Sequence, residues 1–394
     1  MVLLLSETAV RRLLSSPRLL MPSSIISTNR CALLSISPSS PSGPRADVPP
    51  RSIVRYVPPA GTEGGDTLFK PAVLYGGNSS DPDLMGIKVV SVRTCGVPAS
   101  TSLICPLTGA LRAVVSSTYL TAVRTAAGSG AAITECLWRR RAQAMLIPGG
   151  PAPNDLMGHL LANGGRPRVV VFGAGMQAEQ HVRAALSALN TYRAESGGGA
   201  TPGQAQSEVV VTIVNRSRDR AESLKNWLLA AETAAGDRVR LGAVHTIATS
   251  DGSADSASSA VRRAVSAAHL ILLTTGSDVP VLHGRDLNGA TAAVICGAGS
   301  YAAHQSEIDP AAVAKCGEVW IDSPAALDVG DLASCGDRAE VLADVLNPDS
   351  SSGTPLSKCV FYKTVGTSVQ DVASAEHVIR LARQEGLGVE VDMS

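Results

Sequence analysis

The pattern of hydrophobic and polar positions divides the chain into two kinds of segment. Between residues 51 and 116, short runs rich in β-branched residues follow one another, and Thr108 with Gly109 is typical of a hairpin turn. We expect a small, mostly antiparallel sheet from the runs 52–57, 68–75, 86–93, 103–106 and 111–115. The alanine-rich segment 121–137 predicts a helix after this sheet.

In the second half of the chain, apolar runs alternate with helical segments. The runs are 168–172, 208–214, 238–247, 269–274, 292–296 and 318–322. This alternation predicts a parallel, doubly wound sheet, which is an α/β fold. A last strand over 360–363 and a helix over 368–385 follow. Two low-complexity stretches, the Gly-rich 195–206 and the Ser/Ala-rich 249–260, are expected to be exposed loops.

One strand of this second half leads into a glycine-rich turn. The run 168–172 is followed by Gly173, Ala174, Gly175, Met176, Gln177 and Ala178, and then by a helix-like segment, 179–189. The first glycine permits a sharp turn, the second lets a pyrophosphate approach the backbone, and Ala178 lets the helix pack closely on the strand. The N-terminus of the helix then offers free N–H groups to phosphates. The turn predicts a dinucleotide site, and the alternative is a glycine turn in an ordinary strand–helix unit.

The end of the next strand bears on the choice of dinucleotide. An NAD site usually has an acidic residue there, which binds the ribose 2′-hydroxyl. This chain has Asn215, Arg216, Ser217 and Arg218 instead, and two cations with a hydroxyl group suit a 2′-phosphate. We therefore predict NADPH in preference to NAD, with a solvated arginine loop as the alternative.

Two threonines end the fourth strand of the predicted parallel sheet. Thr274 and Thr275 lie where backbone and hydroxyl groups usually contact the nicotinamide side of the cofactor. The alternative role for these residues is to cap the end of the strand.

Composition narrows the class of protein. The chain has 394 residues, of which 45% are hydrophobic, enough for two domains with cores of their own. The formal net charge is zero, which argues against a nucleic acid or an anionic membrane surface as partner, and no apolar run is long enough to span a membrane. The eight cysteines form no CxxC pair and no zinc-like cluster with histidine, so we expect no metal site and a reducing, intracellular compartment.

The N-terminal segment allows two interpretations. Residues 1–30 are rich in Leu, Ser and Arg and poor in acidic residues, as transit peptides are. Residues 6–14 also read as a short helix capped by Ser6, with apolar positions at helical spacing. We expect a cytoplasmic protein, with mitochondrial targeting as the alternative, and a Ser/Pro-rich connector over 35–50.

Five motifs together resemble the ornithine cyclodeaminase/mu-crystallin family over nearly the whole chain. They are Thr121-Ala-Val-Arg-Thr-Ala-Ala, Gly173-Ala-Gly-Met-Gln-Ala, Asn215-Arg-Ser, Gly299-Ser-Tyr-Ala-Ala-His-Gln-Ser-Glu-Ile-Asp and Val365-Gly-Thr-Ser-Val-Gln-Asp-Val-Ala. The resemblance implies a Rossmann-type doubly wound nucleotide-binding domain, 128–350. This domain would be inserted into a mixed α+β domain, made of 1–127 and 351–394, that binds substrate and forms a homodimer.

The resemblance also implies which residues bind substrate. Members of the family act on small imines or amino acids, and Arg51, Lys88 and Arg124 match the family positions that hold the substrate carboxylate. Lys88 is the only charge in the apolar run 85–92, and Arg124 lies among Ala and Thr residues, so each needs a partner for its charge. An arginine can hold a carboxylate through two parallel hydrogen bonds. For each cation the alternative is a structural ion pair or a side chain that extends to solvent.

The departures from the family pattern indicate the reaction. Cyclodeaminases carry an aspartate just after the glycine that ends the fifth strand, whereas this chain has Ala298, Gly299, Ser300 and Tyr301 after Gly297. This resembles the ketimine-reductase and mu-crystallin branch. We therefore predict an NADPH-dependent reductase of cyclic ketimine carboxylates, which forms proline or pipecolate from Δ1-pyrroline-2-carboxylate or Δ1-piperideine-2-carboxylate.

Any proton donor for this reaction would be Lys88 first and His304 second. Two alternatives stay open at this point. One is an NAD-dependent ornithine cyclodeaminase, and the other is an NADPH-regulated protein that binds a small ligand, as mu-crystallin binds thyroid hormone.

Overall fold

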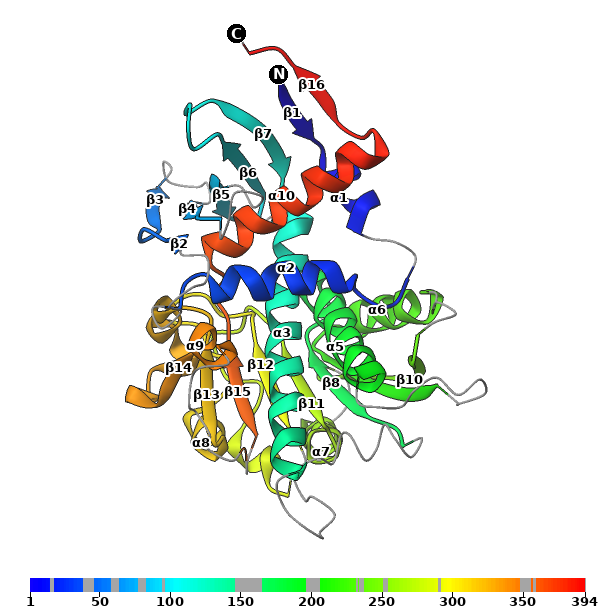
Figure 1. The fold of residues 1–394 in the computed structure, drawn as a ribbon. Coiled ribbons are helices and arrows are strands. Elements are labelled where there is room, and N and C mark those ends of the chain that lie inside the picture. The colour runs from blue at the N-terminus through cyan, green and yellow to red at the C-terminus, as the bar shows by residue number, and fades with distance from the viewer. Residues whose placement is uncertain are drawn as a thin grey trace.

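The computed structural model describes most of the chain in fourteen ranges. They are residues 1–14, 18–37, 46–57, 64–76, 83–93, 96–145, 165–195, 206–231, 233, 237–250, 254–289, 292–347, 356 and 359–393. Within these ranges the chain forms two sheets of eight strands each, one above the other in Figure 1. None of the helices in these ranges is long and apolar enough to cross a bilayer.

The first sheet is mostly antiparallel, as predicted. Its strand order is β16-β1-β7-β6-β5-β4-β2, with β3 paired to β4, and only β1 and β7 run parallel. The strands are β1 Val2–Leu5, β2 Ala46–Asp47, β3 Ser52–Tyr56, β4 Gly65–Leu74, β5 Leu84–Val92, β6 Ala99–Ile104, β7 Leu111–Ser116 and β16 Val389–Val391. The sequence did not indicate β1 and β16, which pair with each other and bring the two ends of the chain side by side (Figure 1).

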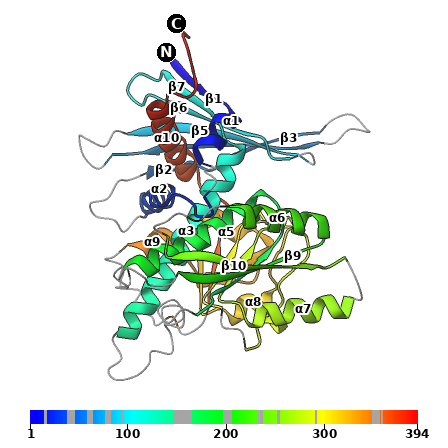
Figure 2. The same ribbon diagram turned by 90° about the vertical axis from the view of Figure 1, so that its right-hand side faces the viewer.

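Three helices are associated with this sheet: α1 (Glu7–Leu14), α2 (Ser23–Leu34) and α10 (Ser368–Glu385). The predicted helix cap at Ser6 is present, since its hydroxyl oxygen accepts from the backbone N–H of Ala9. The N-terminal segment that could also be read as a transit peptide is thus part of the fold, because β1, α1 and α2 contribute to its core. Figure 2 shows α2 between the two sheets.

The second sheet is wholly parallel and doubly wound, as predicted. Its order is β10-β9-β8-β11-β12-β15-β13-β14, so the strand order reverses between β8 and β11. The strands are β8 Arg168–Phe172, β9 Ser207–Asn215, β10 Val239–Ala248, β11 Leu270–Leu273, β12 Val294–Gly297, β13 Glu318–Ile321, β14 Ala339–Val341 and β15 Val360–Lys363. In open α/β sheets a ligand binds where the order reverses.

The position of β15 corrects the boundary predicted at 350/351. The segment 351–394 was assigned to the substrate-binding domain, but β15 pairs with β12 and β13 in the middle of the parallel sheet. A sequence pattern predicts that a strand exists and does not say which neighbours it takes. The chain therefore leaves the second sheet only after Lys363 and returns to the first sheet through α10.

Helices cover both faces of the second sheet. The buried side chains of α3 (Thr118–Met145), α5 (Met176–Glu195), α6 (Arg218–Ala230) and α9 (Leu342–Leu346) pack on one face. Those of α7 (Ala254–Ser266) and α8 (Pro310–Lys315) pack on the other face. The prediction of a loop over 249–260 was wrong in its second half, because small alanines and the apolar pair Val261 and Val265, one turn apart, form and anchor α7.

The long helix α3 connects the two units. Its first half, from Tyr119 to Ala127, packs in the core of the first sheet, and its second half, from Ala132 to Leu137, packs in the core of the second. At 28 residues it is about 42 Å long, and Figure 1 shows it running from one unit to the other. Arg124 lies in the first half, close to the junction.

Candidate functional site

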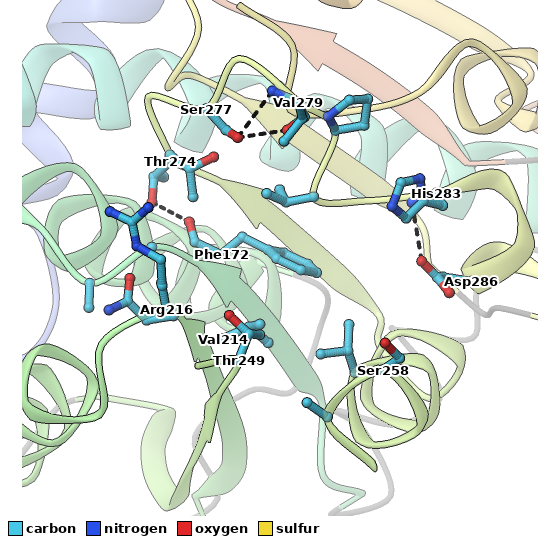
Figure 3. A pocket seen from close by; sticks show the side chains of 18 of the residues that line it. Phe172, Val214, Arg216, Thr249, Ser258, Thr274, Ser277, Val279, His283 and Asp286 are labelled. Carbon is cyan, nitrogen blue, oxygen red and sulfur yellow. Dashed lines mark hydrogen bonds between the residues drawn. The ribbon is translucent and has the colours of Figure 1, made fainter. Parts of the chain in front are cut away.

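A cavity of about 950 Å³ opens at the carboxyl ends of β8, β9 and β11 (Figure 3). Gly173 has φ +107°, and a Cβ there would lie 2.7 Å from the Thr274 hydroxyl oxygen, so the turn and the close packing both require glycine. A Cβ on Gly175 would meet nothing within 4 Å, because this residue faces open space in front of α5. The volume and the open helix N-terminus fit a dinucleotide.

Most of the predicted cofactor residues line this cavity. They are Gly173, Ala174, Gly175, Asn215, Arg216, Ser217, Thr274 and Thr275. Met176 and Gln177 do not line it; they begin α5, and Met176 packs against the core of the first unit instead.

The turn after β9 is built by its own polar side chains. Asn215 Nδ2 donates to the carbonyl oxygen of Ser217 at 2.9 Å, and the Ser217 hydroxyl accepts from the backbone N–H of Arg220 as the cap of α6. These contacts leave the Arg216 side chain free to extend into the cavity (Figure 3). Arg220 also lines the cavity. Arg218 is not among the described residues that line the cavity. The second cation at this turn is therefore Arg220, where the sequence analysis had named Arg218.

Farther along the cavity, Arg262 and Arg285 add two cations that the sequence did not indicate. Both lie within 4.0 Å of the Asp286 carboxylate. Their signal in the sequence is weak, because arginines in exposed helical segments are common.

A buried carboxylate holds the loops behind the two threonines. Glu307 accepts from the backbone N–H and the hydroxyl of Thr275 at 2.5 and 2.9 Å, and from the backbone N–H of Gly299 at 2.7 Å. Burial raises the pKa of Glu307, while Lys363 opposes this rise. The hydroxyl of Thr274 donates to the Phe172 carbonyl oxygen at 2.7 Å. Both threonines therefore line the cavity, and their hydrogen bonds to Phe172 and Glu307 also fix the ends of strands, which is the capping role named as the alternative.

A cluster of three cations surrounds one carboxylate at the junction of the two units. Asp371, in the first turn of α10, accepts from Lys88 Nζ at 2.8 Å and from Arg124 Nε at 2.7 Å through the same oxygen. Lys70 Nζ lies 3.3 Å from its other oxygen and donates to the Gly366 carbonyl oxygen at 2.9 Å. The structure thus brings together Lys88 and Arg124, as predicted, and places Lys70 and Asp371 beside them. We call these four residues the cation cluster.

The cation cluster is buried, and its charges perturb one another. The four side chains are at most 7% exposed. Burial lowers the pKa of Lys70 and lowers that of Lys88 more strongly, and Asp371 opposes both shifts. Burial alone would raise the pKa of Asp371, but Arg124, Lys70 and Lys88 together bring it well below its ordinary value. The aspartate is therefore ionised, and the cations outnumber it.

The cation cluster adjoins the carboxyl edge of the parallel sheet. Lys70 contacts Gly366, in the loop after β15, and β15 is separated from β11 by β12 alone. Two strand spacings place the end of β15 about 10 Å from the end of β11, where Thr274 and Thr275 line the cavity. The predicted cofactor residues that line the cavity therefore lie along the same edge that Lys88 and Arg124 adjoin.

Only glycine fits at the position where the loop after β15 comes closest to the cation cluster. Gly366 has φ +76°, and a Cβ on it would lie 2.6 Å from the Arg124 Cζ atom. The buried carboxylate of Asp322 accepts from the Thr364 hydroxyl and from the Gly366 backbone N–H, both at 2.6 Å. The loop after β15 thus packs against the Arg124 guanidinium and restricts its position.

Two candidate site residues from the sequence analysis, Arg51 and His304, lie outside the cation cluster. Arg51 is half-buried, one residue before β3, and makes no hydrogen bond or ion pair with another described residue. His304 is exposed, with its Nε2 3.8 Å from an Asp278 oxygen. His304 therefore lies at the surface, which does not favour it as a proton donor.

Comparison with known proteins agrees with this architecture, although no family model matches the chain. An uncharacterised cyclodeaminase of Dictyostelium discoideum is 22% identical over 356 residues, which cover 84% of this chain and 83% of that protein. The structure of the Thermococcus litoralis Δ1-pyrroline-2-carboxylate reductase, in complex with NADH and L-proline, is similar with a TM-score of 0.67 and 19% identity, over 99% of this chain and 100% of the other.

A second similar structure is the iminosuccinate reductase of Paracoccus denitrificans in complex with NAD+. Its TM-score is 0.65 at 19% identity, and the match covers 100% of this chain and 99% of that one. The chain therefore has the fold of these proteins over its whole length, and the resemblance drawn from the sequence motifs is confirmed at the level of fold.

Proposed function

We propose that the protein is an NADPH-dependent reductase of cyclic ketimine carboxylates, which converts Δ1-pyrroline-2-carboxylate or Δ1-piperideine-2-carboxylate to proline or pipecolate. The observation that carries the proposal is the cation cluster beside the dinucleotide-sized cavity. One buried donor of the cluster, Arg124 Nη1, has no hydrogen-bond partner among the described residues. A substrate carboxylate would supply the missing acceptor.

The cavity residues support a nicotinamide dinucleotide as cofactor. Gly173, Gly175 and the N-terminus of α5 would hold the pyrophosphate, and Arg216 with Arg220 would hold a 2′-phosphate. When bound, a reduced nicotinamide supplies hydride for an imine carbon. The similar reductases were solved with NADH and NAD+, so the preference for NADPH rests on the arginines of this chain.

The residues of the cation cluster would position the substrate and its proton. Arg124 and Lys88 would hold the carboxylate, and this fixes the ring to which the imine carbon belongs. Lys88 is also the best-placed proton donor to the imine nitrogen, because burial lowers the pKa of its ammonium and so makes the proton easier to give up. The low exposure of the cluster keeps water from the iminium, which water would hydrolyse.

A second candidate function is the cyclisation of ornithine to proline with release of ammonia. The name of the Dictyostelium relative favours it. Against it stands the loop after β12, where Gly299 and Ser300 occupy the place of the cyclodeaminase aspartate.

We also propose a homodimer in the cytoplasm, an assembly that the family resemblance implies. Figure 2 shows β3 projecting from the side of the first sheet. Ile53, Val54 and Tyr56 of this strand are each more than 50% exposed, which suits a surface that a second copy covers. Light scattering during size-exclusion chromatography measures the mass of the assembly, and the mass of one chain would contradict the dimer.

The function is tested by following NADPH oxidation with Δ1-pyrroline-2-carboxylate and with Δ1-piperideine-2-carboxylate. In parallel, ammonia release is measured with L-ornithine and NAD. We expect imine-dependent oxidation and no ammonia. Ammonia release from ornithine without imine reduction would support the cyclodeaminase and overturn the reductase.

A further inference from the structure

Two cysteines bring their sulfur atoms into contact at the amino edge of the parallel sheet. Cys316 lies two residues before β13, and Cys359 lies directly before β15, the neighbour of β13 in the sheet. Their Sγ atoms are 3.3 Å apart, although the two residues are 43 positions apart in the chain. The Cys316 Sγ also donates to the carbonyl oxygen of Ala312 at 3.5 Å. Both side chains are thiols and not halves of a disulfide, so the contact joins two groups that oxidation can couple.

The backbone already places the two cysteines at the separation that a disulfide spans. Glu318 pairs with Val360 in the parallel register, and the backbone N–H of Gly317 donates to the Cys359 carbonyl oxygen at 2.9 Å. Cys316, whose backbone is extended, is therefore offset from Cys359 by one strand spacing of about 4.8 Å and one residue rise of about 3.3 Å. The Cα atoms are then about 6 Å apart, as in native disulfides. A disulfide therefore needs rotation of the side chains and no displacement of either strand.

The two thiols differ in their access to solvent. Cys359 is half-buried, whereas Cys316 is 2% exposed in the core of the second sheet. The hydrogen bond with Cys359, together with burial, raises the pKa of the Cys316 thiol. Arg338 donates to the Cys316 carbonyl oxygen at 2.8 Å, which fixes the backbone at this residue. A small oxidant that enters from solvent therefore meets Cys359 first, and Cys316 is held where it can react second.

We infer that Cys316 and Cys359 form an oxidation site, at which hydrogen peroxide converts the two thiols to a disulfide. The sulfur of Cys359 attacks one peroxide oxygen, so that an S–O bond forms, the O–O bond breaks and the leaving hydroxide takes up the thiol proton as water. The sulfur of Cys316 then attacks the sulfenic acid of Cys359, so that the S–S bond forms, the S–O bond breaks and the hydroxyl leaves with the Cys316 proton as a second water. The two thiols lose two electrons, and one peroxide is reduced to two waters.

The disulfide would stabilise the fold and leave the candidate site untouched. It would close a loop of 43 residues that contains β13, β14 and α9. Closing a loop of this length should raise the midpoint of thermal unfolding by roughly 5 °C in a chain of this size. The two cysteines lie at the start of four-residue strands, about 13 Å from the carboxyl edge where the cavity opens. The inference therefore does not depend on the proposed function.

Mass spectrometry of the full-length protein tests the inference. The reduced protein is treated with a small excess of hydrogen peroxide, the remaining thiols are blocked with iodoacetamide under denaturing conditions, and tryptic peptides are compared with and without dithiothreitol. We expect a cross-link between peptides 316–338 and 359–363 that dithiothreitol removes. No cross-link, whether Cys359 remains a thiol or is oxidised to the sulfinic acid, would overturn the inference.

A matched pair of variants assigns the partner of Cys359, because peptide 316–338 also contains Cys335. Cys335 is 3% exposed, so Cys335→Ala removes a cysteine of similar burial and should retain the cross-link. Cys316→Ala should abolish the cross-link and leave a sulfenic acid on Cys359 that dimedone captures. A cross-link that persists in Cys316→Ala and disappears in Cys335→Ala would overturn the inference.

Thermal unfolding gives a second readout, which needs no variant in the core. Peroxide-treated wild type should unfold roughly 5 °C above the same sample after dithiothreitol. Cys359→Ala changes the half-buried partner and should show no difference between the two treatments. An equal shift in Cys359→Ala would assign the stabilisation to another group and overturn the inference.

Discussion

The carboxylate of Asp371 should be the most costly single charge to remove from this protein. It is 2% exposed and contacts Lys88 at 2.8 Å, Arg124 at 2.7 Å and Lys70 at 3.3 Å. At an effective dielectric constant of about 20, each contact contributes about 5–6 kcal/mol of Coulomb energy. Desolvation of the ions and repulsion among the cations offset most of this. Asp371→Asn should therefore lower the free energy of unfolding by about 3–5 kcal/mol, as when one partner of a buried ion pair is removed.

The free energy of unfolding lost in Asp371→Asn should depend on pH. Lys70 and Lys88 determine the direction of this dependence. Without Asp371, the pKa values of Lys70 and Lys88 in the folded state should fall further below their ordinary value of 10.5. The unfolded chain then binds more protons than the folded one at neutral pH, so the stability of the variant should rise as the pH is raised. The difference from the wild type should shrink as the pH rises toward 10.5, the ordinary pKa of lysine.

The assay is urea denaturation followed by tryptophan fluorescence, to which the buried Trp320 contributes. Asp66→Asn is the matched control, because Asp66 makes the same kind of ion pair with Arg55 at the surface, where Arg55 is 71% exposed. The control should change the free energy of unfolding by less than about 1 kcal/mol. A loss below about 1 kcal/mol in Asp371→Asn, unchanged with pH, would refute the description of the cation cluster.

Four further predictions address the site and the fold. Arg124→Ala should raise KM for the imine acid and lower kcat/KM roughly a hundredfold while the Kd for NADPH is unchanged; an equal loss of NADPH affinity would instead show a structural role. Arg216→Ala should weaken NADPH binding roughly tenfold with little effect on NADH, and fluorescence titration that finds the same ratio of affinities as in the wild type would exclude this arginine from the 2′-phosphate site. Gly366→Ala should displace the Arg124 guanidinium and reproduce the high KM of Arg124→Ala; normal kinetics would contradict the close packing. Burial lowers the pKa of His181 from 6.5 to about 4, so the unfolded chain takes up that proton first and stability should fall by about 1.4 kcal/mol per unit as the pH drops below about 6; denaturation of His181→Leu should show a shallower pH dependence, and an equal slope would assign the effect to other groups.

The sequence predicted the elements whose signal is local. The strand–turn–helix around Gly173 follows from an apolar run, two glycines and a helical pattern, all within about twenty residues. Lys88 and Arg124 were identified from the family resemblance, and each is also a lone charge among apolar or small residues, which is a local signal. Lys70 carries the same signal, since it alternates with the buried Leu68 and Ala72, and was missed.

The features that were missed depend on contacts between distant parts of the chain. Asp371 lies 247 residues from Arg124, and no periodicity shows that α10 brings its first turn to the centre of the cluster. Glu307 is an ordinary acidic residue in a loop until the fold buries it behind Thr275. The place of β15 in the second sheet is likewise a matter of strand order, which local patterns do not encode.

The most direct test of the central claim follows an isotope from cofactor to product. The protein is incubated with Δ1-piperideine-2-carboxylate and NADPH that carries deuterium at the transferable position of the nicotinamide, and the product is examined by mass spectrometry. The account predicts pipecolate with one deuterium at carbon 2, and loss of this product in Arg124→Ala at the same imine concentration. Unlabelled pipecolate, or no amino acid product from any imine carboxylate tested, would contradict it.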